Sequence, residues 1–138
     1  MVNSKTQASN YKQIQNNQAQ NSKQYDLEDR TYGFARRCRD FVSKLPKTIP
    51  NIEYGKQLCR SSGSQAANYI EANESLSKRD FGHRIKISRK EAKESRLWLR
   101  LCEIRDDGDK VLAVEQEELI QEARELTSIF SAIFEKTK

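Results

Sequence analysis

The chain has 138 residues, a length that suits one domain with a modest core. Its formal charge of +5 does not by itself argue for nucleic-acid binding, because Lys5, Lys12 and Lys23 near the N-terminus supply three of the five charges. No apolar run approaches the roughly 20 residues that span a bilayer, and the N-terminus lacks the apolar core of a signal peptide, so we expect a cytoplasmic protein with no membrane partner.

Residues 1–24 have the composition of a disordered tail. They contain eleven Asn or Gln residues, no acidic residue and few large apolar side chains. Such a segment buries too little apolar surface to offset the entropy cost of ordering. The folded domain is therefore expected to span residues 25–138.

Four segments of this domain have the spacing of amphipathic helices. Their apolar residues recur every three or four positions, and only two prolines and five glycines occur in the whole chain. We expect helices over about 26–44, 51–73, 77–105 and 110–136, and no strand. The predicted fold class is all-α, a helical bundle.

The first two helices are expected to meet at a proline-rich connection. The inward face of the first helix is predicted to carry Leu27, Phe34, Cys38, Phe41 and Leu45, with Ala35 and Val42 beside them. Pro46 and Pro50 bracket the connection, because proline ends one helix and is tolerated in the first turn of the next. The second helix has mostly small residues over 61–67. They favour a tight helix crossing over a phosphate-binding loop, since no strand precedes them and no Gly-Lys-Ser follows.

The third helix carries the clearest apolar seam in the chain. Seven residues recur at alternating steps of four and three, namely Phe81, Ile85, Ser88, Ala92, Ser95, Leu99 and Cys102. Ser77 is the predicted N-cap, with Asp80 in the first turn. After a turn at 106–109, the fourth helix is expected to point inward Leu112, Leu119, Ala123, Leu126, Phe130 and Ile133.

The sequence does not favour catalysis or metal binding. His83 is the one histidine, whereas a ferritin-type di-metal site needs a Glu-x-x-His on each of two helices. Cys38, Cys59 and Cys102 are odd in number and widely spaced, so we expect buried thiols rather than a disulfide or a zinc site. We therefore expect no enzyme, no catalytic or metal-binding residue and no cofactor.

Charge is segregated between the last two helices. Residues 77–105 hold ten basic and four acidic groups, whereas 106–138 hold four basic and nine acidic groups. The candidate nucleic-acid surface is a basic row on the third helix, made up of Lys86, Arg89, Lys90, Lys93, Arg96 and Arg100. Like charges four residues apart repel by on the order of a few tenths of a kcal/mol, so we expect a compensating partner. RNA or DNA phosphate is one such partner, with the tail lysines, Arg36, Arg37 and Arg39 adding to the surface.

A salt-bridge ladder is the alternative partner for the basic row. The fourth helix carries an acidic row of Glu115, Glu118, Glu122 and Glu125. In an antiparallel hairpin that turns near Gly108, the predicted pairs are Arg100 with Glu115, Arg96 with Glu118, Lys93 with Glu122 and Arg89 with Glu125. We expect this ladder, within or between subunits, to occupy much of the row, although exposed pairs contribute only ~0.2–1 kcal/mol each.

An apolar stretch at the end of the third helix predicts self-association. Residues 97–104 include six apolar residues in eight positions, and these residues face several directions. One seam cannot bury them all. The candidate oligomer interface is therefore Leu97, Trp98, Leu101 and Ile104.

Several short motifs resemble a family of small bacterial proteins named for reading frames in intervening sequences of 23S ribosomal RNA genes. The motifs are Gln57-Leu58, Arg60-Ser61, Asn68 to Ala72, Ser77 to Phe81, Lys90 to Ser95 and Trp98-Leu99, with a looser match over Phe34 to Pro46. Their order and spacing carry the resemblance, which covers roughly residues 26–135. The resemblance implies an antiparallel up-and-down four-helix bundle that assembles into a ring, a homopentamer, and it implies no established activity.

Polar residues on the matching motifs form a second candidate site. They are Arg60, Asn68, Glu71, Glu91 and Glu94. Polar groups at helix contacts are costly unless paired, so we interpret this polar cluster as a hydrogen-bonded device that fixes helix register within or between subunits. A small-molecule pocket centred on Glu71 and Glu91 is the alternative.

Three functions remain open from the sequence. The first is a non-enzymatic cytoplasmic oligomer that acts as an assembly or nucleic-acid-associated adaptor. The second is suggested by a related branch of the superfamily, the accessory proteins of diversity-generating retroelements, which bind a reverse transcriptase and nucleic acid. The third is a small-molecule-binding bundle.

Overall fold

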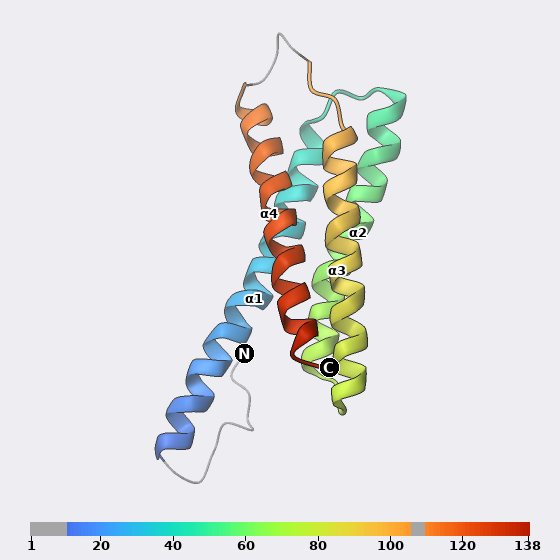
Figure 1. Ribbon diagram of the computed structural model, residues 1–138. Helices are drawn as coiled ribbons and strands as arrows, with labels where there is room; N and C mark the ends of the chain where they lie inside the picture. The colour runs from blue at the N-terminus through green and yellow to red at the C-terminus, as the bar shows by residue number, and fades with distance from the viewer. Residues whose placement is uncertain (1–10, 106–109) are drawn as a thin grey trace.

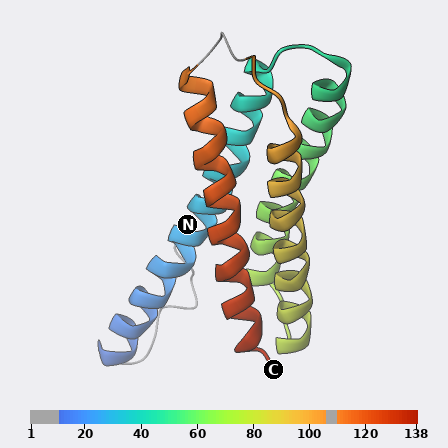
Figure 2. The same ribbon diagram turned by 45° about the horizontal axis from the view of Figure 1, so that its top comes forward.

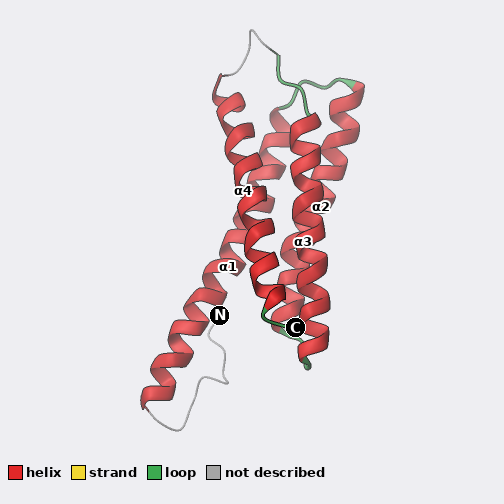
Figure 3. Cartoon of the chain, in the orientation of Figure 1, coloured by secondary structure: helices red, strands yellow, loops and turns green. Residues whose placement is uncertain are grey.

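The structure is a computed structural model that describes residues 11–105 and 110–138. Its secondary structure is helical. The four helices are α1 (Tyr11–Lys44), α2 (Ile49–Asn73), α3 (Lys78–Leu101) and α4 (Lys110–Glu135). They lie side by side, each packed on the next along the chain, and α4 returns to α1 (Figures 1 and 2). Within the described ranges there is no strand (Figure 3). The all-α prediction and the four-helix bundle are confirmed.

Helix α1 is longer than expected at its N-terminal end. It begins at Tyr11 rather than at about Asp26, so residues 11–24 are helical where we expected a disordered tail, while residues 1–10 lie outside the described part. Adding turns to a helix that is already nucleated costs little, and no proline precedes Pro46. The first turns extend past the ends of the other helices (Figure 1).

The predicted apolar seams form the core. On α3 the side chains of Ile85, Ser88, Ala92, Ser95 and Leu99 are fully buried, and Cys102 is buried just beyond the helix end. The core residues from α1, from the residue after it and from α4 are Phe34, Cys38, Phe41, Leu45, Leu112, Leu119, Ala123, Leu126 and Phe130. Leu27, Phe81 and Ile133 are partly buried against them. The periodicity therefore predicted the inward faces of these helices correctly.

The small residues of α2 allow the close contact that the sequence predicted. Ser61 and Ser95 place their hydroxyl oxygens 2.7 Å apart between α2 and α3. Gln65 is also buried, and its Nε2 donates to the carbonyl oxygen of Thr31 in α1 at 2.8 Å. A Cβ at Gly55 would lie 2.8 Å from Cγ1 of Val42. α2 therefore lies close to both of its neighbours.

The helix boundaries follow local chemistry. The hydroxyl of Ser77 accepts a hydrogen bond from the backbone N–H of Asp80 at 3.0 Å, which confirms the predicted N-cap. Thr48 caps α2 in the same way, and Pro50 lies in its first turn. Helix α3 ends at Leu101 rather than at Arg105. The predicted turn at 106–109 lies outside the described residues.

One of the three cysteines departs from expectation. Cys38 and Cys102 are buried as predicted, but Cys59 is exposed. Cys59 lies on α2, where it lines surface hollows together with residues of α1. Burial raises the pKa of the Cys102 thiol to about 11, so this thiol stays protonated at neutral pH.

The described part of the chain contains no candidate membrane-spanning helix. None of α1 to α4 combines the length and the apolar character that crossing a bilayer requires.

Candidate functional site

The acidic row of α4 faces α1. Nε and Nη2 of Arg30 donate to the two carboxylate oxygens of Glu122, both at 2.8 Å, and Nη2 also donates to Glu125 at 2.7 Å. Bidentate pairs of this kind are the strongest common form of salt bridge. The hydrogen bond with Glu122 raises the pKa of the Arg30 guanidinium.

The same arrangement recurs one heptad further along α1. Arg37 donates from Nε and Nη2 to Glu115 at 3.3 and 2.7 Å, and from Nη2 to Glu118 at 2.9 Å. The hydrogen bond with Glu115 raises the pKa of Arg37 as well. Two arginines of α1 therefore bind all four glutamates of the acidic row, and we call this set the α1–α4 clamp.

The predicted ladder between α3 and α4 does not form within the subunit. None of its four pairs forms an ion pair in the described structure, because the acidic row points at α1 instead. The register of the two helices was nevertheless predicted well. Gln116 donates from Nε2 to the carbonyl oxygen of Leu99 at 2.9 Å, one residue away on each helix from the predicted pair of Arg100 and Glu115. The error lies in the rotation of α4 about its own axis, which the core residues Leu119 and Ala123 fix.

The basic row of α3 is left with few internal partners. Lys90 lies 3.9 Å from Glu94, a loose pair within the helix, and Glu94 is also 3.1 Å from Arg60. Lys93 and Arg100 are exposed and form no ion pair with any described residue. The row is therefore a cationic surface with few ion pairs to described residues.

An aromatic ring marks the end of the row near the C-terminus. Lys86 and Arg89 lie 5.9 and 5.2 Å from the ring centroid of Phe134, and Lys138 lies 5.7 Å from it. Cation–π contacts at such sites contribute about 0.5–1 kcal/mol each. They hold three cations together without neutralising any of them.

Arg96 differs from the other members of the row. It is partly buried, and its Nε is enclosed without a hydrogen-bond partner in the described structure. A buried donor without a partner is costly. The structure offers no account of this atom within the single chain.

The predicted polar cluster forms in part. Glu91 is only 6% exposed, and Arg60 donates to both of its carboxylate oxygens at 3.3 and 3.4 Å and to Glu94 at 3.1 Å. Asn68 lies apart and accepts from Arg84 at 3.0 Å. Glu71 is exposed and does not join the cluster. The structure therefore does not bring together the two glutamates on which the small-molecule pocket depended.

The candidate oligomer interface divides into two kinds of side chain. Leu97 and Leu101 are 45% and 38% exposed. Trp98 instead stacks on Tyr54 of α2 with the ring centroids 6.0 Å apart, and Ile104 packs against the core. The subunit thus buries part of the apolar surface that the sequence left over.

Two residues of the clamp were not identified from the sequence as a pair. Arg37 was expected only to extend a basic surface, and Arg30 was not singled out. A signal was present, because the two arginines are seven residues apart and the glutamate pairs repeat with the same interval. Matching periods on two antiparallel helices predict facing rows.

Metal binding has no site in the described residues. No group of three His, Cys, Asp or Glu side chains is placed to hold a metal ion. His83 is exposed on α3.

Comparisons with known proteins agree with the fold. A comparison with curated proteins gives no match. The chain is similar to a crystal structure of a protein of unknown function from the S23 ribosomal protein family of Bacteroides thetaiotaomicron. The TM-score is 0.63 at 26% sequence identity, over 78% of this chain and 97% of the other. Residues 23–132 match the family described as 23S rRNA-intervening sequence protein. The chain belongs to the 23S rRNA-intervening sequence protein family.

Proposed function

We propose that this protein is a non-enzymatic adaptor that binds the phosphate backbone of RNA through the basic row of α3. One observation carries the proposal. The glutamates expected to neutralise the row are bound by Arg30 and Arg37 of α1, so no carboxylate of this acidic row compensates the repulsion between the cations of α3. A polyanion supplies that compensation.

The shape of the row suits a phosphate backbone. Lys86 and Arg100 are fourteen residues apart on one straight helix, which corresponds to roughly 20 Å at 1.5 Å per residue. Each lysine or arginine that contacts a phosphate releases counterions, so affinity is independent of sequence and falls steeply with salt. The family description and the name of the similar structure both refer to ribosomal components, which makes RNA the first ligand to test.

Self-association is the second part of the proposal. Helices α2 and α4 begin, and α3 ends, at the same end of the bundle (Figure 1), and three exposed apolar residues lie at these helix ends. Ile49 is 80% exposed, Val111 78% and Leu101 38%. Such a concentration on a water-soluble surface is typical of an interface. A ring of five copies, as the family resemblance implies, stays a prediction, and so does a reverse-transcriptase partner.

Two measurements test the proposal. Titration of a labelled RNA duplex at low and at physiological salt should give binding that weakens steeply with salt and is equal for two unrelated sequences. No binding at low salt would contradict the RNA part. Light scattering should give several times the 16.0 kDa mass of one chain, and a folded monomer would contradict the assembly part.

A further inference from the structure

Two hollows lie on the outer surface between α1 and α2, and we call them together the groove. Their volumes are about 450 and 320 Å³, and both are lined by Cys59. On α1 the lining extends from Tyr32 to Leu45. At 1.5 Å per residue this distance is roughly 20 Å, the length of a helix of about 14 residues.

The groove has an apolar floor and a positive rim. Val42, Leu45 and Ile52 line the first hollow, and Tyr32, whose side chain is 60% exposed, lines the second. The cations of the rim are Arg36, Arg39, Lys47 and Lys56, and no carboxylate lines either hollow. Nearby acids neutralise half of the rim, since Arg39 contacts Asp40 at 3.0 Å and Lys56 contacts Glu53 at 3.5 Å. Arg36 and Lys47 have no ion pair among the described side chains.

Gly63 in the second hollow has no packing reason among the described residues, and neither does Gly33, which lies outside the hollows. A glycine inside a helix costs about 1 kcal/mol relative to alanine. Gly55 has a packing reason in the contact with Val42, but a Cβ at Gly63 would meet nothing within 4 Å. A glycine that faces open space in a groove lets the backbone of another molecule approach closely.

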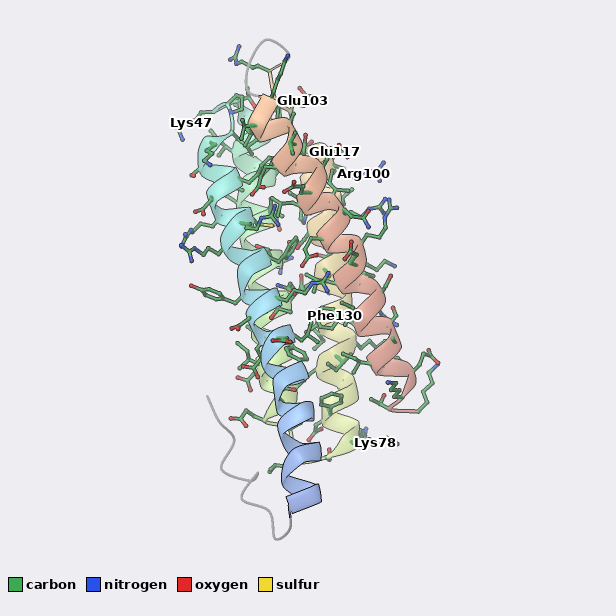
Figure 4. All side chains as sticks on the ribbon, turned by 90° about the vertical axis from the view of Figure 1, so that its left-hand side faces the viewer. Lys47, Lys78, Arg100, Glu103, Glu117 and Phe130 are labelled. Atoms are coloured by element: carbon green, nitrogen blue, oxygen red, sulfur yellow. The ribbon has the colours of Figure 1, made fainter. Side chains whose placement is uncertain are left out.

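From the apolar floor, the positive rim and the open glycine, we infer that this groove binds an acidic amphipathic helix of a partner protein. The inference rests on the proposed adaptor role, which requires a second partner besides RNA. A hydrated phosphate backbone matches the polar row of α3 better than it matches a floor of valine, leucine and isoleucine. The two surfaces are also separate, because Lys47 and Arg100 lie at opposite edges of the bundle in Figure 4.

Cys59 provides a reporter inside the groove. It is the exposed thiol, whereas Cys38 and Cys102 are buried. The probe is a synthetic helix of about 16 residues with leucine at every third or fourth position and glutamate between. The matched control is the same peptide with lysine in place of glutamate. Bound peptide should slow the alkylation of Cys59 by iodoacetamide.

The inference predicts protection by the acidic peptide and none by the basic peptide. Two variants should each weaken the affinity for the acidic peptide about tenfold, or 1.4 kcal/mol, as read from the peptide concentration that gives half-maximal protection. One is Gly63→Leu, which fills the groove with a good helix former. The other is the double variant Arg36→Gln with Lys47→Gln. Circular dichroism should show that both variants stay folded. Equal protection by both peptides, protection by neither, or variants that bind like the wild type would overturn the inference.

Two further readouts separate this inference from the proposed function. RNA binding should be unchanged in Gly63→Leu, because the basic row of α3 is not altered. If RNA binding is absent in the wild type while peptide protection remains, the RNA proposal fails and the groove stands. If Gly63→Leu instead lowers the oligomer mass in light scattering, a second copy of this chain fills the groove, and the assignment to another protein is wrong.

Discussion

Nη2 of Arg37 in α1 lies 2.7 Å from Oε1 of Glu115 in α4. The contact pairs a glutamate of α4 with an arginine of α1 and not with the basic row of α3. Together with the matching contact of Arg30 and Glu122 at 2.8 Å, it assigns the acidic row of α4 to α1. The basic row of α3 is free for that reason.

The clamp should contribute modestly to stability. Arg37→Gln is expected to lower the free energy of unfolding by about 0.5–1 kcal/mol, because the arginine is 41% exposed and water screens the pair. Urea denaturation at low and at high salt measures the loss, which should shrink in high salt. Arg124→Gln is the matched control, since Arg124 is exposed and has no ion pair in the described structure. An equal loss in both variants would contradict a specific role for the clamp.

The clamp also predicts a dependence on pH. Hydrogen bonds from Gln121 and Arg30 lower the pKa of Glu125 below its ordinary value of 4.5. A carboxylate with a lowered pKa stabilises the fold above its unfolded pKa, and this stabilisation disappears as pH falls through the folded pKa. In thermal melts between pH 3 and pH 7, Glu125→Gln should reduce the midpoint near neutral pH and differ less from the wild type in acid. A constant difference across the range would refute this assignment.

Two glycines should respond to alanine in opposite directions. Gly55→Ala places a Cβ 2.8 Å from Cγ1 of Val42, so one helix must shift, at a cost of about 1–3 kcal/mol. Gly33→Ala meets nothing within 4 Å and should stabilise the fold by about 0.5–1 kcal/mol, because alanine favours the helix. Chemical denaturation of the two variants side by side tests the prediction. Destabilisation by both changes would mean that α1 and α2 do not pack as described.

The thiols should divide into one reactive group and two protected groups. Cys59 is exposed, whereas Cys38 and Cys102 are buried, and although partial burial raises the pKa of Cys59 too, the reagent reaches this thiol without opening of the core. A colorimetric thiol reagent at pH 8 should therefore modify one thiol per folded chain rapidly and three in denaturant. Cys59→Ser should abolish the rapid phase. Two or more rapid thiols in the native protein would contradict the described burial.

The sequence predicted what depends on periodicity. The seam from Ile85 to Leu99 was correct because each of its residues repeats at the spacing of a helix face. The N-cap at Ser77 was correct because a serine hydroxyl binds the backbone three residues on, which is a local interaction. The burial of Phe34 in α1 and of Phe130 in α4 followed from the same argument.

The sequence could not show with which helix the charged residues beside an apolar face form ion pairs. Glu115 and Glu122 border the apolar face of α4, and a small rotation of that helix moves them from α3 to α1. Side-chain packing of the whole core fixes this rotation, and no local pattern encodes it. The sequence also did not show the partner of Trp98, since the ring that stacks on it belongs to Tyr54 on another helix.

The length of α1 shows another limit of composition. Residues 11–24 are rich in Asn and Gln and have no core to build, yet they continue a helix that is packed from Leu27 onward. Composition indicates how much apolar surface a segment can bury. The extension of an existing helix depends instead on the helical turn that it continues.

The most direct test of the account compares two charge-matched double variants in RNA binding. Lys90→Gln with Lys93→Gln removes two charges from the basic row, and Lys44→Gln with Lys110→Gln removes two charges from exposed positions outside it. Each variant is titrated with a labelled RNA duplex at low and at physiological salt, and circular dichroism confirms that it is folded. The account predicts that only the first variant loses affinity, about equally for all sequences, and that its dependence on salt becomes less steep because fewer counterions are released. Equal losses in the two variants, or unchanged binding after the loss of Lys90 and Lys93, would contradict a phosphate site on α3.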